Sequence, residues 1–232
     1  MLELINLYKN FGKLKVLENL NIKIKKKEFV VLLGPNGCGK TTILRIIAGL
    51  EEPTKGNIMK REENIGFIFQ ESVLFPWRNV EKNIEFGLEV KNIKNRKKII
   101  KKYIKLIGLI RFENYHPEEL SGGMKQKVAL ARTLAVNPSL LLVDEPFSSL
   151  DALTRKKMQK EFVKIWQKTK KTIIFVTHDI EEALFLADRI ILLSERPASI
   201  ISEFEIKIDR KKRDTYNKKL NKIRETIIKK LS

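Results

Sequence analysis

The stretch Phe29-Val-Val-Leu-Leu-Gly-Pro-Asn-Gly-Cys-Gly-Lys-Thr-Thr42 runs from an apolar segment into a glycine-rich loop. Residues 34–41 fit the pattern G-x-x-x-x-G-K-S/T, and the apolar run before them reads as a buried strand. Gly37 and Gly39 let the backbone curl without a side chain in the way, so that inward-turned N–H groups can surround phosphate oxygens. Apolar positions after the loop predict a helix over residues 40–48, whose positive end faces the same phosphates. The stretch therefore predicts a phosphate cradle behind a central strand.

The side chains of this cradle have separate roles in the prediction. We expect Lys40 to bring a mobile charge to the β- and γ-phosphates of a nucleotide, and Thr41 to offer its hydroxyl to Mg²⁺. Cys38 is interpreted as a small filler of the loop, because no base is placed to activate its thiol. The residues of the cradle are Gly34, Pro35, Asn36, Gly37, Cys38, Gly39, Lys40 and Thr41.

A pair of carboxylates ends a second buried strand, Leu140-Leu-Leu-Val-Asp-Glu145. In open α/β sheets, ligands bind outside the carboxyl ends of the strands. Asp144 is suited to hold Mg²⁺ as a hard oxygen ligand, and Glu145 can polarise an attacking water. Taken alone, the pair could also cap a loop. His178 ends a further strand, where we expect it to hydrogen-bond the γ-phosphate and to orient Glu145 and water.

The rest of the chain alternates short apolar runs with helical patterns, which predicts an α/β protein with a largely parallel sheet. Residues 72–136 lack a comparable strand, and the apolar positions in 91–107 follow one face of a helix that Gly108 ends. Residues 2–28 alternate polar and apolar positions, which suggests an antiparallel hairpin layer. The expected strands are 29–33, 140–143, 173–176 and 190–193. The expected division is an α/β core of residues 1–71 and 137–208, an inserted helical subdomain of 72–136 and a basic tail of 209–232.

Composition limits the cellular setting. The chain has 232 residues and one cysteine, so no intrachain disulfide is possible and a reducing compartment is expected. No apolar stretch approaches the length of a membrane span, and the first residues lack the pattern of a signal peptide. The net charge of +19 is concentrated in residues 91–105 and 209–232. Such a charge is compatible with nucleic acid, with an anionic membrane face, or simply with solvated basic helices.

A second anion-binding helix end follows from Leu120-Ser-Gly-Gly-Met-Lys-Gln-Lys-Val-Ala-Leu-Ala-Arg132. Ser121 is a good N-cap, Gly122 and Gly123 expose backbone N–H groups, and Asn137-Pro138 stops the helix near residue 135. One nucleotide has no evident need of two such ends. The economical interpretation is that this end meets the γ-phosphate of a nucleotide held by a partner subunit.

With these motifs the chain resembles the nucleotide-binding subunits of ABC transporters, over residues 2 to about 206. The resemblance implies a P-loop NTPase (RecA-like) core, an ATPase activity with ATP and Mg²⁺, and a homodimer around two ATP molecules. It also implies roles for residues outside the cradle: Thr42 would complete the Walker A loop, Gln70 would reach Mg²⁺ and the membrane partner, Asp151 would cross the dimer interface, and Phe11 would stack on adenine. Two positions depart from the family pattern. Met124 stands where a glutamine is usual, and Phe11 stands where a tyrosine is common, with Tyr8 as a rival.

The segments Gln70-Glu-Ser-Val-Leu-Phe-Pro-Trp-Arg-Asn-Val80 and Ser194-Glu-Arg-Pro-Ala198 are similar to those of importers for nitrate, sulfonates and taurine. This implies a transmembrane permease partner, indirectly an extracytoplasmic solute-binding protein, and a peripheral place at the cytoplasmic face of the cell membrane. An exporter or lipoprotein-release ATPase is an alternative. A soluble ABC ATPase acting on DNA is disfavoured, since the chain holds one ATP-binding half and no heptad run, so no nucleic acid is expected.

Overall fold

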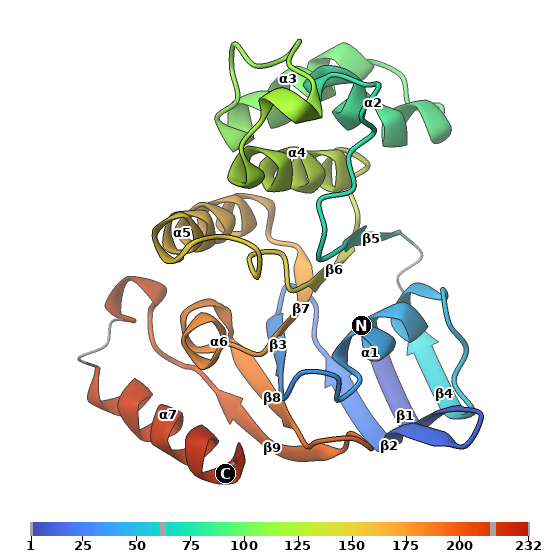
Figure 1. Cartoon of the computed structure of the whole chain (residues 1–232), viewed down its shortest axis with the longest axis vertical. Coiled ribbons are helices and arrows are strands. Elements are labelled where there is room, and N and C mark those ends of the chain that lie inside the picture. Colours follow the sequence, from blue (N-terminus) through green and yellow to red (C-terminus); the bar gives the residue numbers. More distant parts are fainter. Residues whose placement is uncertain (1, 61–63, 214–216, 232) are drawn as a thin grey trace. The chain divides into compact units, whose positions relative to one another are not determined.

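The computed structural model describes residues 2–60, 64–213 and 217–231, and the chain divides into two compact units (Figure 1). The first unit comprises Met1–Glu63, Leu142–Glu145 and Lys171–Ser232, and the second comprises Asn64–Leu141 and Pro146–Lys170. The predicted helical segment 72–136 lies within the second unit. Whether it behaves as a separate subdomain stays a prediction.

An antiparallel sheet opens the first unit. Strands β1 (Leu2–Phe11) and β2 (Leu14–Ile24) form a hairpin, and β4 (Lys55–Lys60) pairs with the other side of β1. Buried and exposed residues alternate along β1, because one face of the pair packs inward. The predicted antiparallel layer is confirmed, and β4 extends it by a strand that the sequence did not signal.

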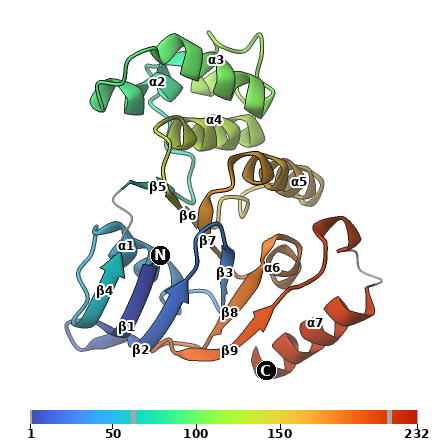
Figure 2. The same cartoon turned by 180° about the vertical axis from the view of Figure 1, so that it is seen from behind.

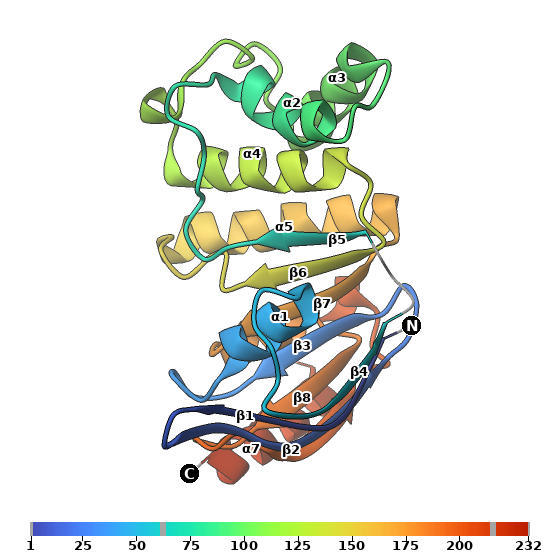
Figure 3. The same ribbon diagram turned by 90° about the vertical axis from the view of Figure 1, so that its right-hand side faces the viewer.

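The second sheet carries the parallel core of this unit (Figure 3). Strand β3 (Phe29–Leu33) pairs in parallel with β7 (Thr172–Thr177) and β8 (Arg189–Leu193), and β9 (Ile200–Glu205) closes the edge antiparallel to β8. Strand β6 (Leu140–Asp144) is buried throughout. The four strands predicted from apolar runs are all present, since residues that face packed layers on both sides are uniformly apolar.

Helices complete the first unit. Helix α1 (Lys40–Ala48) begins at the predicted residue and ends at Gly49, whose φ of 75° makes the usual left-handed cap. Helix α6 (Ile180–Leu186) follows β7, and a 3-10 turn η2 (Arg210–Lys212) leads towards α7 (Lys218–Leu231). The predicted basic tail of residues 209–232 thus contains η2 and α7, while residues 214–216 and 232 lie outside the described residues.

The second unit is mainly helical. It contains the short strand β5 (Ile65–Ile68), helices α2 (Val80–Val90), α3 (Arg96–Ile107), α4 (Gly122–Ala135) and α5 (Ala152–Thr169), and the 3-10 turn η1 (Pro117–Glu119). Residues 72–136 form helices, turns and loops and contain no strand, as predicted. Helix α3 begins five residues later than predicted, because Asn92 and Asn95 adopt left-handed conformations that break the backbone before it. Among the described residues, no helix combines the length and apolarity needed to cross a membrane.

Candidate nucleotide site

The loop after β3 has the backbone of an anion cradle. Gly37 and Gly39 have φ values of 74° and 120°, in the region that favours glycine. A Cβ at position 39 would lie 2.8 Å from Leu17 Cδ2 and 2.9 Å from Val16 Cγ1, both on β2. Glycine at this position therefore lets the hairpin pack against the loop while the N–H groups remain available to an anion.

Lys40 occupies the interior of the loop and is only 4% exposed. Its Nζ donates hydrogen bonds to the carbonyl oxygens of Gly34 at 2.9 Å and of Pro35 at 2.7 Å. The same ammonium lies 3.6 Å from Oε1 of Glu145. A positive charge is thus held beside the loop, among acceptors that are weaker than a phosphate would be.

Thr41 and Asp144 bring two hard oxygen donors together. The Thr41 hydroxyl donates to Asp144 Oδ1 at 3.0 Å. Burial raises the pKa of the Asp144 carboxyl above its ordinary value, and the hydrogen bond from Thr41 opposes this effect. A buried carboxylate whose charged form is penalised gains from a cation, so this pair fits the Mg²⁺ that the sequence predicts here.

Glu145 and His178, which the sequence predicts to act on the attacking water, are hydrogen-bonded to each other. His178 Nδ1 donates to Glu145 Oε2 at 2.8 Å, and the Glu145 backbone N–H donates to the Val176 carbonyl at 3.1 Å. Glu145 has a φ of 39°, an uncommon conformation for a residue with a side chain. Such strain persists where the surroundings impose it, and it occurs most often at functional sites.

Two further residues of the prediction, Cys38 in the cradle and Phe11 outside it, differ in exposure. Cys38 is buried, and burial raises the pKa of its thiol, which agrees with a filler rather than a nucleophile. Phe11, the residue predicted to stack on adenine, is 46% exposed, and Lys9 Nζ lies 4.6 Å from the centre of its ring. Tyr8 is half-buried on the same strand. Phe11 is therefore no core residue, and its stacking role stays a prediction.

The signature segment lies in the second unit. Ser121 caps α4, its Oγ accepting from Met124 N at 3.4 Å, and the first turn of that helix contains no acidic residue. Ser121 and Gly122 are exposed. The N-terminal end of α4 thus presents backbone N–H groups without a carboxylate to compete with an anion. Asp151 caps α5 in a similar way, and hydrogen bonds from Thr154 and Leu153 lower the pKa of its carboxyl.

Gln70 also belongs to the second unit. Its Nε2 donates to Ser148 Oγ at 3.4 Å, and its backbone carbonyl accepts from Gln126 Nε2 at 3.3 Å. Gln126 lies on α4 and is 4% exposed, a buried polar link that the sequence reasoning did not identify. The sequence marks Gln126 only by its position, two residues after Met124 at the start of α4. The role of Gln70 as a metal ligand stays a prediction, because Thr41 and Asp144 lie in the other unit.

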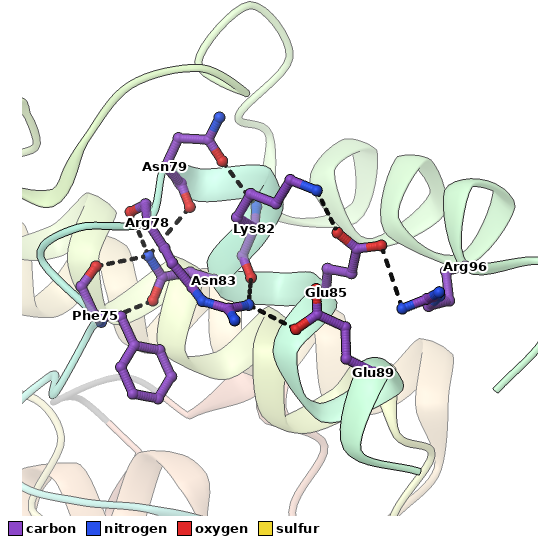
Figure 4. Close-up of polar contacts among 8 residues, drawn as sticks. All are labelled: Phe75, Arg78, Asn79, Lys82, Asn83, Glu85, Glu89 and Arg96. Atoms are coloured by element: carbon purple, nitrogen blue, oxygen red, sulfur yellow. Dashed lines mark hydrogen bonds and ion pairs between the residues drawn. The ribbon is translucent and has the colours of Figure 1, made fainter. Parts of the chain in front are cut away.

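The loop that follows Gln70 is held by a buried asparagine (Figure 4). Asn83 Oδ1 accepts from Phe75 N at 2.9 Å, and its Nδ2 donates to the carbonyl oxygens of Arg78 at 2.7 Å, Asn79 at 3.1 Å and Phe75 at 3.2 Å. Arg78 in turn pairs with Glu89 at 2.7 Å. Within this fixed loop Trp77 is 72% exposed, so a large apolar side chain is presented to solvent on a rigid support.

Comparison with known proteins fits these motifs. Residues 17–148, more than half of the chain, match the ABC transporter family. The chain belongs to the ABC transporter family. Its relatives include an uncharacterized ABC transporter ATP-binding protein of Methanocaldococcus jannaschii, 46% identical over 96% of this chain and 89% of that protein. The aliphatic sulfonates import ATP-binding protein SsuB of Bacillus anthracis is 46% identical over 83% of this chain and 79% of its own. The taurine import ATP-binding protein TauB of Escherichia coli O157:H7 is 42% identical over 91% of this chain and 86% of its own.

Solved structures of ABC cassettes share the fold. The dimeric structure of the bacterial ABC transporter cassette MJ0796 has a TM-score of 0.77 and 34% identity, covering 90% of this chain and all of that one. The same cassette in a post-hydrolysis state bound to ADP and Pi has a TM-score of 0.76. The predicted P-loop NTPase fold, the ABC resemblance and the ATPase activity are therefore confirmed.

Proposed function

We propose that this ABC ATPase is the energy-supplying subunit of an importer and that it works as a head-to-tail homodimer around two Mg-ATP. The observation that carries the proposal is the presence of two anion-ready helix ends in one chain. The first is the cradle at α1, and the second is the exposed start of α4 at Ser121 and Gly122. A single ATP needs only the first of them, so the second is available for ATP held by another subunit.

The residues of the first unit would carry the chemistry. Lys40 and the N–H groups of residues 34–42 would hold the phosphates, and Thr41 and Asp144 would hold Mg²⁺. When bound, Mg²⁺ would neutralise charge that develops on the phosphates. Glu145 would accept the proton of the attacking water, and His178, hydrogen-bonded to Glu145, would orient that carboxylate.

The residues of the second unit would make the dimer responsive to ATP. Ser121, Gly122 and Gly123 of one subunit would bind the γ-phosphate held by Lys40 of the other, and Asp151 would cross the interface. The γ-phosphate would then join the two surfaces, and its hydrolysis would let them separate. A helix end that binds the phosphate only in the dimer makes association depend on the state of the nucleotide.

The membrane partner would be a permease that contacts the loop from Gln70 to Trp77. The exposed Trp77 on its clamped loop supports this assignment, because aromatic anchors on rigid supports are typical of interface centres. The names of the sulfonate and taurine relatives support import and a small anionic solute such as a sulfonate, nitrate or taurine. The subunit would lie peripherally at the cytoplasmic face of the membrane, and a solute-binding protein outside would deliver the solute.

A mild-detergent pull-down of the tagged chain from native membranes tests the importer assignment. We expect mass spectrometry to recover a multi-spanning membrane protein together with a solute-binding protein. A Trp77→Ala chain should recover several-fold less of the membrane protein, while an exposed control such as Lys229→Ala should not. Recovery of a membrane protein without a binding protein would favour the exporter alternative. Recovery of DNA or soluble partners alone would contradict transport.

A further inference from the structure

The C-terminal segment packs against helix α6 within the first unit (Figure 2). Leu220 and Ile227 of α7 are buried, which places one face of that helix against the protein. Arg224 of the same helix forms a two-pronged ion pair with Glu181 in the first turn of α6, and its Nη2 lies 2.7 Å from Glu181 Oε2. Bidentate arginine–carboxylate pairs fix orientation as well as distance.

Two arginines just before α7 close the other end of α6. The last carbonyls of a helix have no partner inside it, and a helix as short as α6 depends on outside donors. Arg213 Nη1 donates to the carbonyl oxygens of Ala187 at 2.6 Å, Phe185 at 3.1 Å and Leu184 at 3.3 Å. Arg210 Nη2 donates to the Leu186 carbonyl at 2.8 Å and to Asp188 Oδ1 at 2.7 Å.

The arginine cap is charged under ordinary conditions. Burial, and secondly the charge of Arg210, lower the pKa of Arg213 to about 10, so its guanidinium remains protonated at neutral pH. A positive charge at a helix C-terminus is also favoured by the helix dipole. Arg210 and Arg213 therefore bond to the end of α6 and are not simply solvated, although by sequence they belong to the basic tail.

Helix α6 continues directly from the reactive histidine. Asp179, the residue after His178, caps α6 through Oδ1, which accepts from Glu182 N at 3.1 Å. Its backbone N–H donates to Thr177 Oγ1 at 3.0 Å. Glu181, the partner of Arg224, is three residues after His178. The C-terminal segment thus contacts both ends of α6, the helix that begins two residues after His178.

We propose that residues 210–213 and helix α7 form a clasp on α6 that positions His178 against Glu145. This inference rests on the proposed function, because it assigns no chemistry of its own. Arg210, Arg213 and Arg224 are positioning residues, since none of them contacts the reacting groups. The clasp sets how well His178 holds the Glu145 carboxylate for hydrolysis, and it leaves the phosphate cradle around Lys40 unchanged.

A charge-reversal cycle on the full chain tests the clasp. We expect Arg224→Glu and Glu181→Arg each to lower kcat for ATP hydrolysis by about fivefold while KM for ATP stays within about twofold. The double variant restores the pair in reverse and should recover most of kcat. A positioning role predicts that kcat falls in the single variants while Tm stays nearly constant, whereas a pair with only a stabilising role would change kcat in parallel with Tm. Lys229→Glu makes the same charge change at an exposed position of α7 and should leave kcat unchanged. Arg224→Gln removes the pair without repulsion and should give a smaller loss in the same direction.

Thermal unfolding of each variant and a Glu145→Gln chain in the same assay separate the possible failures. Near-normal hydrolysis by Glu145→Gln would overturn the proposed chemistry and the clasp with it. An inactive Glu145→Gln beside a fully active Arg224→Glu would overturn the clasp alone. So would a loss of kcat that only follows a loss of Tm, and so would a loss of kcat that the double variant does not recover.

Discussion

Glu145 combines a strained backbone, a histidine partner and a lysine neighbour at the end of a buried strand. The backbone of Glu145 has a φ of 39°. Its carboxylate lies 2.8 Å from His178 Nδ1 and 3.6 Å from Lys40 Nζ, and these contacts together fix the position of that carboxylate. The sequence predicted the three residues, because each follows a recognisable strand or loop. It could not predict the strained conformation, which arises from how the ends of β6 and β7 meet.

Replacing Glu145 by Gln should abolish turnover and retain ATP binding. The amide cannot accept a proton at neutral pH, whereas the cradle around Lys40 is unaltered. We expect kcat to fall by about 100-fold or more, with the affinity for ATP changed by less than about threefold. Equilibrium binding of a fluorescent ATP analogue and steady-state phosphate release measure the two quantities. Lys40→Ala is the contrasting variant, since it should weaken nucleotide binding itself.

Replacing Asp144 by Asn should stabilise the nucleotide-free chain and weaken its response to Mg²⁺. Burial raises the pKa of Asp144, so the folded state binds this proton more tightly than the unfolded state. The buried charge therefore lowers the free energy of unfolding. This destabilisation is absent well below the ordinary carboxyl pKa and reaches its full size once the pH exceeds the raised pKa. At neutral pH the variant should gain a few degrees in Tm, since about 1 kcal/mol corresponds to roughly 2–4 °C at this chain length.

Scans of Tm against pH, with and without Mg-ATP, test the Asp144 prediction. The gain should shrink as pH falls towards the ordinary carboxyl pKa, because wild-type Asp144 then becomes neutral as well. In the presence of Mg-ATP the wild-type chain should be stabilised more than the variant. An Asp144→Asn chain with the same pH dependence as the wild type would show that burial of this charge has no cost.

At the scale of elements, the loop between β5 and α2 depends on one side chain. The four backbone groups that bond to Asn83 span residues 75–79, and the amide that serves them is fully buried (Figure 4). Asn79 supplies a more ordinary contact, the N-cap of α2 at 2.9 Å from Lys82 N. The two asparagines therefore provide a matched comparison within one loop.

We expect Asn83→Ala to lower the free energy of unfolding by about 2–4 kcal/mol, because it removes four hydrogen bonds that hold a part-buried loop. The N-cap variant Asn79→Ala should cost about 1 kcal/mol. Urea unfolding followed by tryptophan fluorescence gives both values, and Trp77 lies inside the affected loop. Equal losses in the two variants would mean that the buried amide adds nothing beyond a cap.

The elements that sequence could predict are those with a local signal. Apolar runs marked the four core strands, and Ser121 and Gly108 marked helix ends that the structure contains. Helix α3 begins later than expected, because Asn92 and Asn95 adopt left-handed conformations that the apolar spacing does not report. The contacts of Arg224 with Glu181 and of Gln126 with Gln70 join positions 43 and 56 residues apart, and no local pattern reports such pairs.

At the scale of the whole molecule, the basic charge has at least two origins. Arg210, Arg213 and Arg224 bond to α6 within the first unit. The basic residues of α3, in contrast, are mostly exposed. Net charge alone therefore does not separate basic residues that hold the fold from basic residues that face solvent. The proposed working form is a dimer. In that dimer the start of α4 would bind the γ-phosphate of the ATP held by the other subunit.

The most direct test of the account is the mass of the Glu145→Gln chain in solution with Mg-ATP, measured by light scattering. We expect a monomer without nucleotide and a dimer of twice that mass with ATP. Adding Gly122→Asp should keep the chain folded, because a carboxylate suits the first turn of α4 and a Cβ there meets Leu150 Cδ2 at an ordinary 3.4 Å. It should nevertheless abolish the dimer, since that carboxylate would face the γ-phosphate. A Glu145→Gln chain that binds ATP and stays monomeric, or a Gly122→Asp chain that still dimerises, would contradict the account.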